Sequence, residues 1–496
     1  MNDIKEKIAD YINQHKSSLL YDIDHRSIEQ SVMGLINGNK AAGNILNIDD
    51  TTIKERVYKE IGQQETKQAL QIKEEGVVVY SQNSFVVSPR PAVYHDNGTT
   101  QPPQQQEKLQ INSFDMRILS KYNLIFRQCE FNVGLSMDYG LKCRQVAFYD
   151  CAFNDKWLIK NLSADDTFSM ENCTFNKDVD FSNGKFLNNV YFNNSHFKGY
   201  ADFHECEFEK TACFYGITFE KSPNFSQAIF KGSLNIVNTN LNFDFENLNE
   251  RIKQEYQNFN ANKGQENRKS LDKFANDFRD SFRNFKSALI KDNNLLDASN
   301  FHKYELYCKE IELDSKNPKI FSKDFIDKWQ LFFYRITSNH HTDLLKSFHS
   351  LLVVIGIFAF LNIATIIGFN CYCLQNISLS PYTLIAHHNA IIKHLLNCNY
   401  ISLLGINFAL AVVFILLFCF SLCSKIRKII ISLSYFLVLL LLISLPQYII
   451  PTIGIFTDKR PLLDPLSIIG GIYTLLFAIM FFSLIKTARK NSIIPH

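Results

Sequence analysis

The sequence has little net charge and little tryptophan. Its 496 residues include 52 Lys and Arg against 49 Asp and Glu, a formal net charge of +3, so no strong overall field favours nucleic acid as a partner. Hydrophobic residues make up 46% of the chain, which excludes a largely disordered protein. Only 2 Trp occur beside 43 Phe, and this excess of one aromatic type needs its own explanation.

Acidic residues are nearly missing from the C-terminal part. Residues 347–496 hold 9 Lys and Arg and 2 Asp and Glu, a net charge of +7, whereas residues 1–346 carry a net charge of −4. A soluble part is therefore joined to a part of different composition. The N-terminus also lacks the apolar run of a secretory signal peptide, so we expect the N-terminal part to stay in the cytosol.

Four apolar stretches are long enough to cross a hydrocarbon core about 30 Å thick. They cover residues 348–370, 401–423, 429–450 and 465–485, and the last three contain no charged residue. Buried helices of soluble proteins rarely run uncharged for so long. The sequence therefore predicts an α-helical transmembrane bundle of four spans over residues 346–490, rather than the core helices of a large soluble domain.

Basic residues around the four spans predict their orientation. An even number of spans returns the chain to one side, where basic residues should gather. Nine lie on the side of the termini: Lys328, Arg335, Lys346, Lys425, Arg427, Lys428, Lys486, Arg489 and Lys490. Three lie on the other side: Lys393, Lys459 and Arg460. This bias predicts a multi-pass protein of a bacterial-type inner (plasma) membrane with both termini in the cytoplasm.

The loop over residues 371–400 is then expected to face outward. It contains Cys371, Cys373, His387, His388, His394 and Cys398. This spacing fits no tetrahedral Cys and His pattern, so a disulfide or free cysteines are favoured over a metal site. We predict neither a metal site nor a cofactor.

The phenylalanines recur every eleven residues in two registers. The first is apolar throughout: Phe126, Met137, Phe148, Ile159, Met170, Phe181, Phe192, Phe203, Phe214, Phe225 and Ile236. The second fails at Lys142 and is weak at Ala164: Phe131, Lys142, Phe153, Ala164, Phe175, Phe186, Phe197, Phe208, Phe219, Phe230 and Leu241. Large residues thus alternate at steps of five and six, which fits neither the period of a helix nor that of a strand.

Small or branched residues stand two positions before most of these large ones, for example Val146, Gly184 and Ala201. A chain that turns a corner every five or six residues and stacks coil on coil explains this spacing. Each Phe would lie above its equivalent, one strand spacing or about 4.8 Å away. The ladder predicts a β-solenoid over residues 124–241, with the phenylalanines as its structural core and no interior space for a ligand.

The run VDFSNGKFLNNVYFNNSHFKGYADFHECEFEKTACFYGITF resembles the pentapeptide-repeat family in its Phe-rich variant. The resemblance implies a right-handed quadrilateral β-helix of about five coils. The family includes DNA-mimicking inhibitors of topoisomerases and many membrane-tethered proteins. Residues 126–241 hold 14 Asp and Glu and 11 Lys and Arg, a net charge of −3, and this surface is too weakly acidic for a DNA mimic.

A helical connector is expected over residues 246–345. Leu271, Phe274, Phe278, Phe282, Phe285 and Leu289 recur at helical spacing, and the pattern resumes from Phe301 to Ile311. This predicts a helix pair whose apolar faces cap the solenoid. The stretch SFRNFKSALIKDNNLLDASNFHKYELYCKE is similar to the segment that follows the solenoid in membrane-anchored members of the family. A third helix, over residues 322–337, would lie near the membrane surface.

The N-terminal residues 1–110 give the least information. They combine short helical patterns, a candidate strand in GVVVYSQNSFVV and a linker near residues 99–108. Their role cannot be named from the sequence.

Signatures of catalysis are missing. No GxxxxGK[ST], GxGxxG, HExxH, GxSxG or CxxC motif occurs, and a coil filled by Phe leaves no pocket for a catalytic group. The sequence therefore predicts no enzyme and no catalytic residue. The expected function is a non-enzymatic cytoplasmic binding or scaffolding module on a membrane anchor. Its expected partners are the lipid bilayer and an unidentified protein but no nucleic acid, and homo-oligomerisation is left open.

An ion-channel-like protein with a regulatory solenoid is the alternative. The stretch Thr452, Ile453, Gly454, Ile455, Phe456 resembles the TVGYG filter signature of potassium channels. Phe456 replaces the second glycine, and the apolar segment before it is long for a pore helix. The candidate pore residues are Thr452, Ile453 and Gly454.

Overall fold

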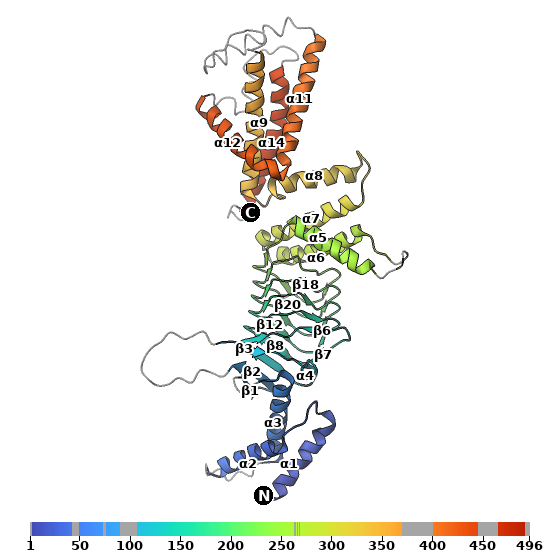
Figure 1. Ribbon diagram of the computed structural model, residues 1–496, viewed down its shortest axis with the longest axis vertical. Helices are drawn as coiled ribbons and strands as arrows, with labels where there is room; N and C mark the ends of the chain where they lie inside the picture. Colours follow the sequence, from blue (N-terminus) through green and yellow to red (C-terminus); the bar gives the residue numbers. More distant parts are fainter. Residues whose placement is uncertain are drawn as a thin grey trace, which may run out of the picture. The chain divides into compact units, whose positions relative to one another are not determined.

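The computed structural model describes residues 2–41, 49–72, 76–89, 107–261, 264, 266, 268–369, 400–444 and 465–491. The chain divides into two compact units, Met1–Lys316 and Asn317–His496 (Figure 1). The boundary between these units falls within the expected connector, residues 246–345. Its helices up to Lys316 belong to the first unit, and its last helix belongs to the second.

The first unit begins with three helices that have a core of their own. Helices α1 (Asn2–His15), α2 (His25–Ala41) and α3 (Asp50–Leu70) are joined in part by a 3₁₀ turn at Lys16–Ser18. Apolar residues at helical spacing meet between them: Ile8, Ile12, Ile28, Val32, Ile36, Ile53, Val57 and Ile61. Asp49 caps α3, since its carboxylate accepts a hydrogen bond from the Thr52 amide at 2.9 Å.

A hairpin links these helices to the solenoid. The candidate strand of the sequence is two strands, β1 (Gly76–Ser81) and β2 (Ser84–Pro89), which pair antiparallel. Gln82 and Asn83 both have positive φ, 49° and 64°, as a tight two-residue hairpin turn requires. β2 then pairs in parallel with β4 (Leu124–Arg127), so the hairpin extends one sheet of the solenoid.

The predicted β-solenoid is confirmed, with about six turns rather than five. The stack begins earlier than the ladder, because β3 (Leu109–Ile111) already pairs in parallel with β5 (Cys129–Phe131). One sheet continues from β4 through β8 (Val146–Tyr149), β12 (Phe168–Glu171), β16 (Val190–Tyr191), β20 (Ala212–Cys213) and β23 (Leu234–Asn235). A second continues from β5 through β9 (Ala152–Phe153), β13 (Thr174–Phe175), β17 (His196–Phe197), β21 (Thr218–Phe219) and β24 (Asn240–Leu241).

Two further sheets complete the coil. One contains β6 (Leu135–Met137), β10 (Trp157–Ile159), β14 (Val179–Asp180) and β18 (Ala201–Asp202). The other contains β7 (Lys142–Cys143), β11 (Ser163–Ala164), β15 (Lys185–Phe186), β19 (Glu207–Phe208) and β22 (Ile229–Phe230). Phe153 pairs with Phe131 and Phe175, each 22 residues away, so equivalent residues of successive coils lie in register.

Tight turns with a left-handed residue explain the five-residue steps. At one corner the Gly184 amide donates to the Phe181 carbonyl at 3.0 Å, and Asn183 between them has a φ of 57°. A type II turn requires positive φ at that position, which Asn and Gly tolerate best. Residues with positive φ recur every eleven positions: Asp150, Asn161, Asn172, Asn183, Asn194, Glu205, Gly216, Gln227 and Asn238. The Asn-rich spacing of the sequence thus marks the corners.

The second register shifts by one residue at its failing step. Cys143, not Lys142, pairs with Ala164 and points into the core. Lys142 lies outside, where its ammonium is 2.9 Å from the Asp165 carboxylate. The coil still has 22 residues between Phe131 and Phe153, but its corner lies one residue later, so that Cys143 takes the inward position. The ladder is therefore more regular in space than it is in the sequence.

Helices α5 (Phe245–Asn260), α6 (Leu271–Lys291) and α7 (Leu295–Ser315) close the other end of the solenoid. The Phe285 ring of α6 lies edge-on to Phe225 with centroids 4.8 Å apart, and it also contacts Phe301 of α7 at 5.5 Å. The Tyr304 hydroxyl donates to the Leu241 and Phe243 carbonyls at 3.1 Å each. The helix pair therefore covers the last coil and satisfies part of its exposed backbone.

The second unit contains the short helix α8 (Lys323–Ser338) and four long apolar helices, α9 (Leu344–Phe369), α11 (Tyr400–Leu422), α12 (Ser424–Ser444) and α14 (Pro465–Asn491). Among the described residues, these four are long and apolar enough to cross a membrane, as predicted. Figure 1 shows them as a bundle. α12 begins earlier than residue 429, so Arg427 lies on a helix and not in a loop between spans.

Gly356 of α9 allows α12 to pack closely against α9. A methyl group at Gly356 would lie 2.4 Å from the Ser434 hydroxyl oxygen and 2.8 Å from its Cα, so only glycine allows this helix contact. We expect Gly356→Val to displace α12 and to lower the thermal midpoint of the detergent-solubilised chain. Gly405→Val on α11 is the matched control, since nothing lies within 4 Å of a β-carbon at that position. Equal midpoints for both variants would contradict this contact.

Candidate functional site

The predicted core phenylalanines form columns of stacked rings. One column runs Phe131, Phe153, Phe175, Phe197, Phe219, with successive centroids 5.0, 4.6, 4.4 and 5.3 Å apart. Four further stacks contain two or three rings each: Phe126 with Phe148; Phe181, Phe203 and Phe225; Phe186, Phe208 and Phe230; and Phe192 with Phe214. Rings of neighbouring columns meet edge-on, as Phe192 and Phe203 do at 5.4 Å. All fifteen are buried except Phe230, which is partly buried.

In one coil the large and the small inward residues exchange places: the column position holds the smaller side chain, and the position two residues before it holds the larger one. Where the columns hold the smaller Ile159, Ala164 and Met170, the positions two residues earlier hold Trp157, Leu162 and Phe168, all buried. Trp157 lies edge-on to Phe153 with centroids 4.3 Å apart. A large residue thus fills the space that a small column residue leaves, which keeps the interior close-packed. Periodicity alone did not reveal this exchange.

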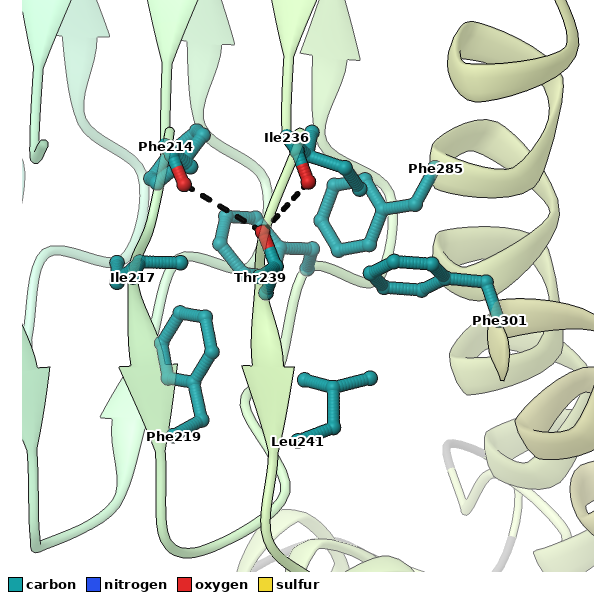
Figure 2. Close-up of a pocket in the computed structure, with 9 residues that line it drawn as sticks. Phe214, Ile217, Phe219, Ile236, Thr239, Leu241, Phe285 and Phe301 are labelled. Atoms are coloured by element: carbon teal, nitrogen blue, oxygen red, sulfur yellow. Dashed lines mark hydrogen bonds between the residues drawn. The ribbon is translucent and has the colours of Figure 1, made fainter. Parts of the chain in front are cut away.

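The cavity at the capped end of the solenoid is too small for a substrate. Its volume is about 10 Å³, roughly one water molecule. Figure 2 shows it lined by rings of the last coils and by Phe285 and Phe301. Thr239 brings the only polar side chain, and its hydroxyl donates to the Ile236 carbonyl at 2.7 Å. This lining offers no general acid, base or nucleophile.

The cysteines of the solenoid lie in its interior. Cys129, Cys151, Cys173 and Cys206 are buried, and the Cys206 thiol donates to the Phe181 carbonyl at 3.1 Å. Burial raises the pKa of the Cys143 thiol to about 12 and raises that of Cys206 as well. These two thiols stay protonated, and protonated thiols are poor nucleophiles and poor metal ligands. No cluster of His, Cys, Asp or Glu suited to a metal ion occurs in the described part of the chain.

The outer faces carry polar ladders. The Asn154 amide donates to Asn132 and the Asn176 amide donates to Asn154, each at 2.7 Å, so asparagines stack along one face. Lys231 on another face pairs with Glu209 at 2.5 Å. Apolar side chains also reach solvent, and Tyr139, Leu187, Tyr215 and Ile229 are exposed. With the interior filled, these faces are what the solenoid offers to another molecule.

A cluster of charges forms where α5 covers one face. The Arg251 guanidinium lies 3.5 Å from the Asp202 carboxylate and 2.6 Å from Glu255, and it stacks over the Tyr200 ring at 4.3 Å. His204 bonds to the other oxygen of Asp202 at 2.9 Å. Arg251 and Asp202 are buried. This network fixes α5 to strand β18, and nothing in the sequence periodicity pointed to it.

Two opposing effects act on the pKa values of this cluster. Burial alone would raise the pKa of Asp202 and lower that of His204, but their mutual hydrogen bond and opposite charges reverse both shifts. The pKa of Asp202 therefore lies below its usual value and that of His204 above. Burial raises the pKa of Glu255 against the nearby Arg251 charge. Asp180 and Glu205 add to the negative field at His204.

These shifts predict a pH dependence. A raised histidine pKa contributes stability that is fully present below about pH 6.5 and is lost as the pH rises through the higher pKa of the folded state. Because His204 is partly exposed, we expect a loss of at most about 1 kcal/mol. The thermal midpoint of the chain should fall between pH 6 and pH 9, and less so in His204→Asn. An identical fall in both proteins would contradict the prediction.

The candidate pore residues Thr452, Ile453 and Gly454 lie outside the described residues, as does the loop with Cys371, Cys373, Cys398 and its histidines. The ion-conducting alternative therefore stays a prediction. Most of the expected linker near residues 99–108 lies outside as well.

Comparison with known proteins gives one result for the solenoid. Residues 165–207 match the family model described as pentapeptide repeats, in 9 copies. No curated protein and no solved structure matches the chain. The matched segment runs from just after β11 to the first residue of β19, in the centre of the stack. The chain thus carries a Phe-rich pentapeptide-repeat solenoid together with C-terminal apolar helices.

Proposed function

We propose that the chain is a non-enzymatic membrane-anchored protein whose solenoid is a cytoplasmic binding or scaffolding surface. The observation that carries this proposal is the filled interior. Stacked rings occupy the solenoid from Phe126 to Phe225, and the cavity at its end is no larger than about one water molecule. Function must then reside on the outer faces. Four helices suited to crossing a membrane follow in the part of the chain that the structure describes.

The arrangement of the helical bundle supports a cytoplasmic solenoid. The Ser347 and Thr487 hydroxyls are 3.3 Å apart, so α9 begins where α14 ends. Arg427 at the start of α12 donates to the Ser350 hydroxyl at 2.8 Å, which places it at the same end. Lys346 and Lys486 adjoin these contacts in the sequence. Basic residues gather on the cytoplasmic side of membrane proteins, and this end connects to the solenoid along the chain.

Affinity capture tests the binding role. The detergent-solubilised full chain and a chain that lacks residues 124–241 would be compared for the proteins they retain. We expect at least one protein to bind the full chain and to be lost with the deletion. Retention of the same proteins by both chains would refute the scaffolding role. A membrane-impermeant reagent that labels lysines on intact cells tests on which side of the membrane the solenoid lies. Efficient labelling of the solenoid lysines would refute a cytoplasmic location.

A further inference from the structure

Helix α8 has one apolar face along its whole length. Phe325, Ile326, Trp329, Phe332, Phe333 and Ile336 fall within one third of the helical circumference. The opposite face holds Asp324, Asp327, Lys328 and Arg335. Ser322 caps the helix, since its hydroxyl accepts from the Phe325 amide at 3.2 Å. The helix is therefore amphipathic and has a defined start.

The C-terminal half of α8 is fixed to the bundle. Three carbonyls of its last turn accept side-chain hydrogen bonds: Arg335 from Lys346 at 3.0 Å, Ile336 from Arg427 at 3.0 Å and Thr337 from Ser350 at 2.8 Å. Phe333 also contacts Phe418 of α11 with ring centroids 6.2 Å apart. These contacts give the carbonyls at the end of the helix side-chain partners and hold α8 across one end of the bundle (Figure 1).

The N-terminal half of the same apolar face is exposed. Ile326 is 57% exposed and Trp329 is 52% exposed, although Trp329 lies beside Phe325 and Phe332 at 6.1 and 5.5 Å. Phe321, just before the helix, is 87% exposed. The face that meets the bundle at Phe333 thus continues beyond it as uncovered aromatic surface.

The bundle's own surface indicates what covers this face. Phe408 of α11, Phe436 of α12 and Phe482 of α14 are exposed, as the side chains of membrane-spanning helices are toward acyl chains. α8 lies at one end of this bundle, and Trp is favoured at the boundary between acyl chains and headgroups. We propose that α8 lies flat in this boundary, with Phe325, Ile326 and Trp329 inserted among the lipid chains.

This proposal rests on the membrane anchoring of the bundle. The polar face of α8 carries both signs of charge, with Asp324 and Asp327 beside Lys328 and Arg335. The attraction is therefore to the apolar layer of the bilayer and not to an anionic headgroup. Vesicles of neutral phosphatidylcholine should be sufficient for insertion.

Tryptophan fluorescence gives a direct test, because the chain has only 2 Trp and the other, Trp157, is buried in the solenoid core. The full chain with Trp157→Phe would be reconstituted in phosphatidylcholine vesicles brominated either near the glycerol or near the chain ends. We expect strong quenching of Trp329, greater with the shallow bromines, and protection from aqueous iodide. The difference between the unsubstituted chain and Trp329→Phe gives the same quantity if Trp157→Phe folds poorly.

Two matched substitutions test the face. Ile326→Glu and Leu331→Glu each replace an aliphatic side chain by a carboxylate, about 140° apart around the helix. We expect Ile326→Glu to reduce the quenching of Trp329 at least twofold and Leu331→Glu to leave it unchanged. If the chain floats with the vesicles in a density gradient while Trp329 is quenched by iodide and not by the brominated lipids, this result would overturn the proposal for α8 but not the membrane anchoring of the bundle. If the chain does not float with the vesicles, both are overturned.

Discussion

Phe203→Asp is expected to unfold the solenoid. The Phe203 side chain is fully buried, stacked on Phe181 and Phe225 at 5.6 and 4.7 Å. Removal of a buried phenyl ring costs about 3–5 kcal/mol, and an unpaired carboxylate in its place adds several more. The sum approaches the entire stability of a typical domain, about 5–15 kcal/mol. We expect rapid trypsin cleavage between residues 156 and 231 at temperatures where the unsubstituted chain resists.

Leu187→Asp is the matched control. Leu187 follows the buried Phe186 directly but points outward and is 45% exposed. The same carboxylate there stays in water, so trypsin resistance should match that of the unsubstituted chain. Resistance of Phe203→Asp, or equal cleavage of both variants, would refute the stacked core.

Glu65→Ala is expected to detach the N-terminal helices from the solenoid. Glu65 of α3 is fully buried, and its carboxylate accepts from the Leu20 amide at 2.6 Å and from the Lys121 ammonium and Tyr122 hydroxyl at 2.5 Å each. Burial and the bond to Glu65 raise the pKa of Tyr122. Removal of one partner of a buried charge pair costs about 3–5 kcal/mol. Hydrogen exchange should accelerate in α3 and β1.

Glu55→Ala on the exposed face of the same helix is the control for Glu65→Ala. It removes the same side chain and changes the same charge without leaving a buried group unpaired, so exchange in α3 should stay slow. The coils beyond β12 should remain protected in both variants, because each coil contacts mainly its neighbours. Slow exchange in Glu65→Ala would show that the network does not hold the helices.

Most of the solenoid could be predicted from the sequence, because a stacked coil places equivalent residues at a fixed interval. The prediction failed where a contact joins one particular pair of residues and does not recur from coil to coil. Lys142 broke the register because one corner of its coil lies one residue later than the period predicts, and Trp157 occupies space that Ile159 leaves. Gly62 is required because a methyl group there would lie 2.1 Å from the Phe85 ring, a contact that no period encodes.

The candidate surface was less predictable than the core. The filled interior followed from the Phe ladder, but the network of Asp202, His204 and Arg251 joins residues up to 49 positions apart through a helix that covers one face. Similarly, the amphipathic pattern of α8 was visible in the sequence. Its attachment through Arg427 was not, because that residue lies 91 positions from the carbonyl it binds.

The parallel pairing of successive coils has a consequence for synthesis on the ribosome. Strand β2, already held by the N-terminal helices, offers an open edge to β4, and each later strand pairs with one made 22 or so residues before. Growth can thus proceed from a ready template, one layer at a time, while translation continues. The first apolar span begins only at Leu344. The whole stack can therefore assemble before any membrane-spanning segment leaves the ribosome, where its apolar side chains could bind to the unfinished solenoid core.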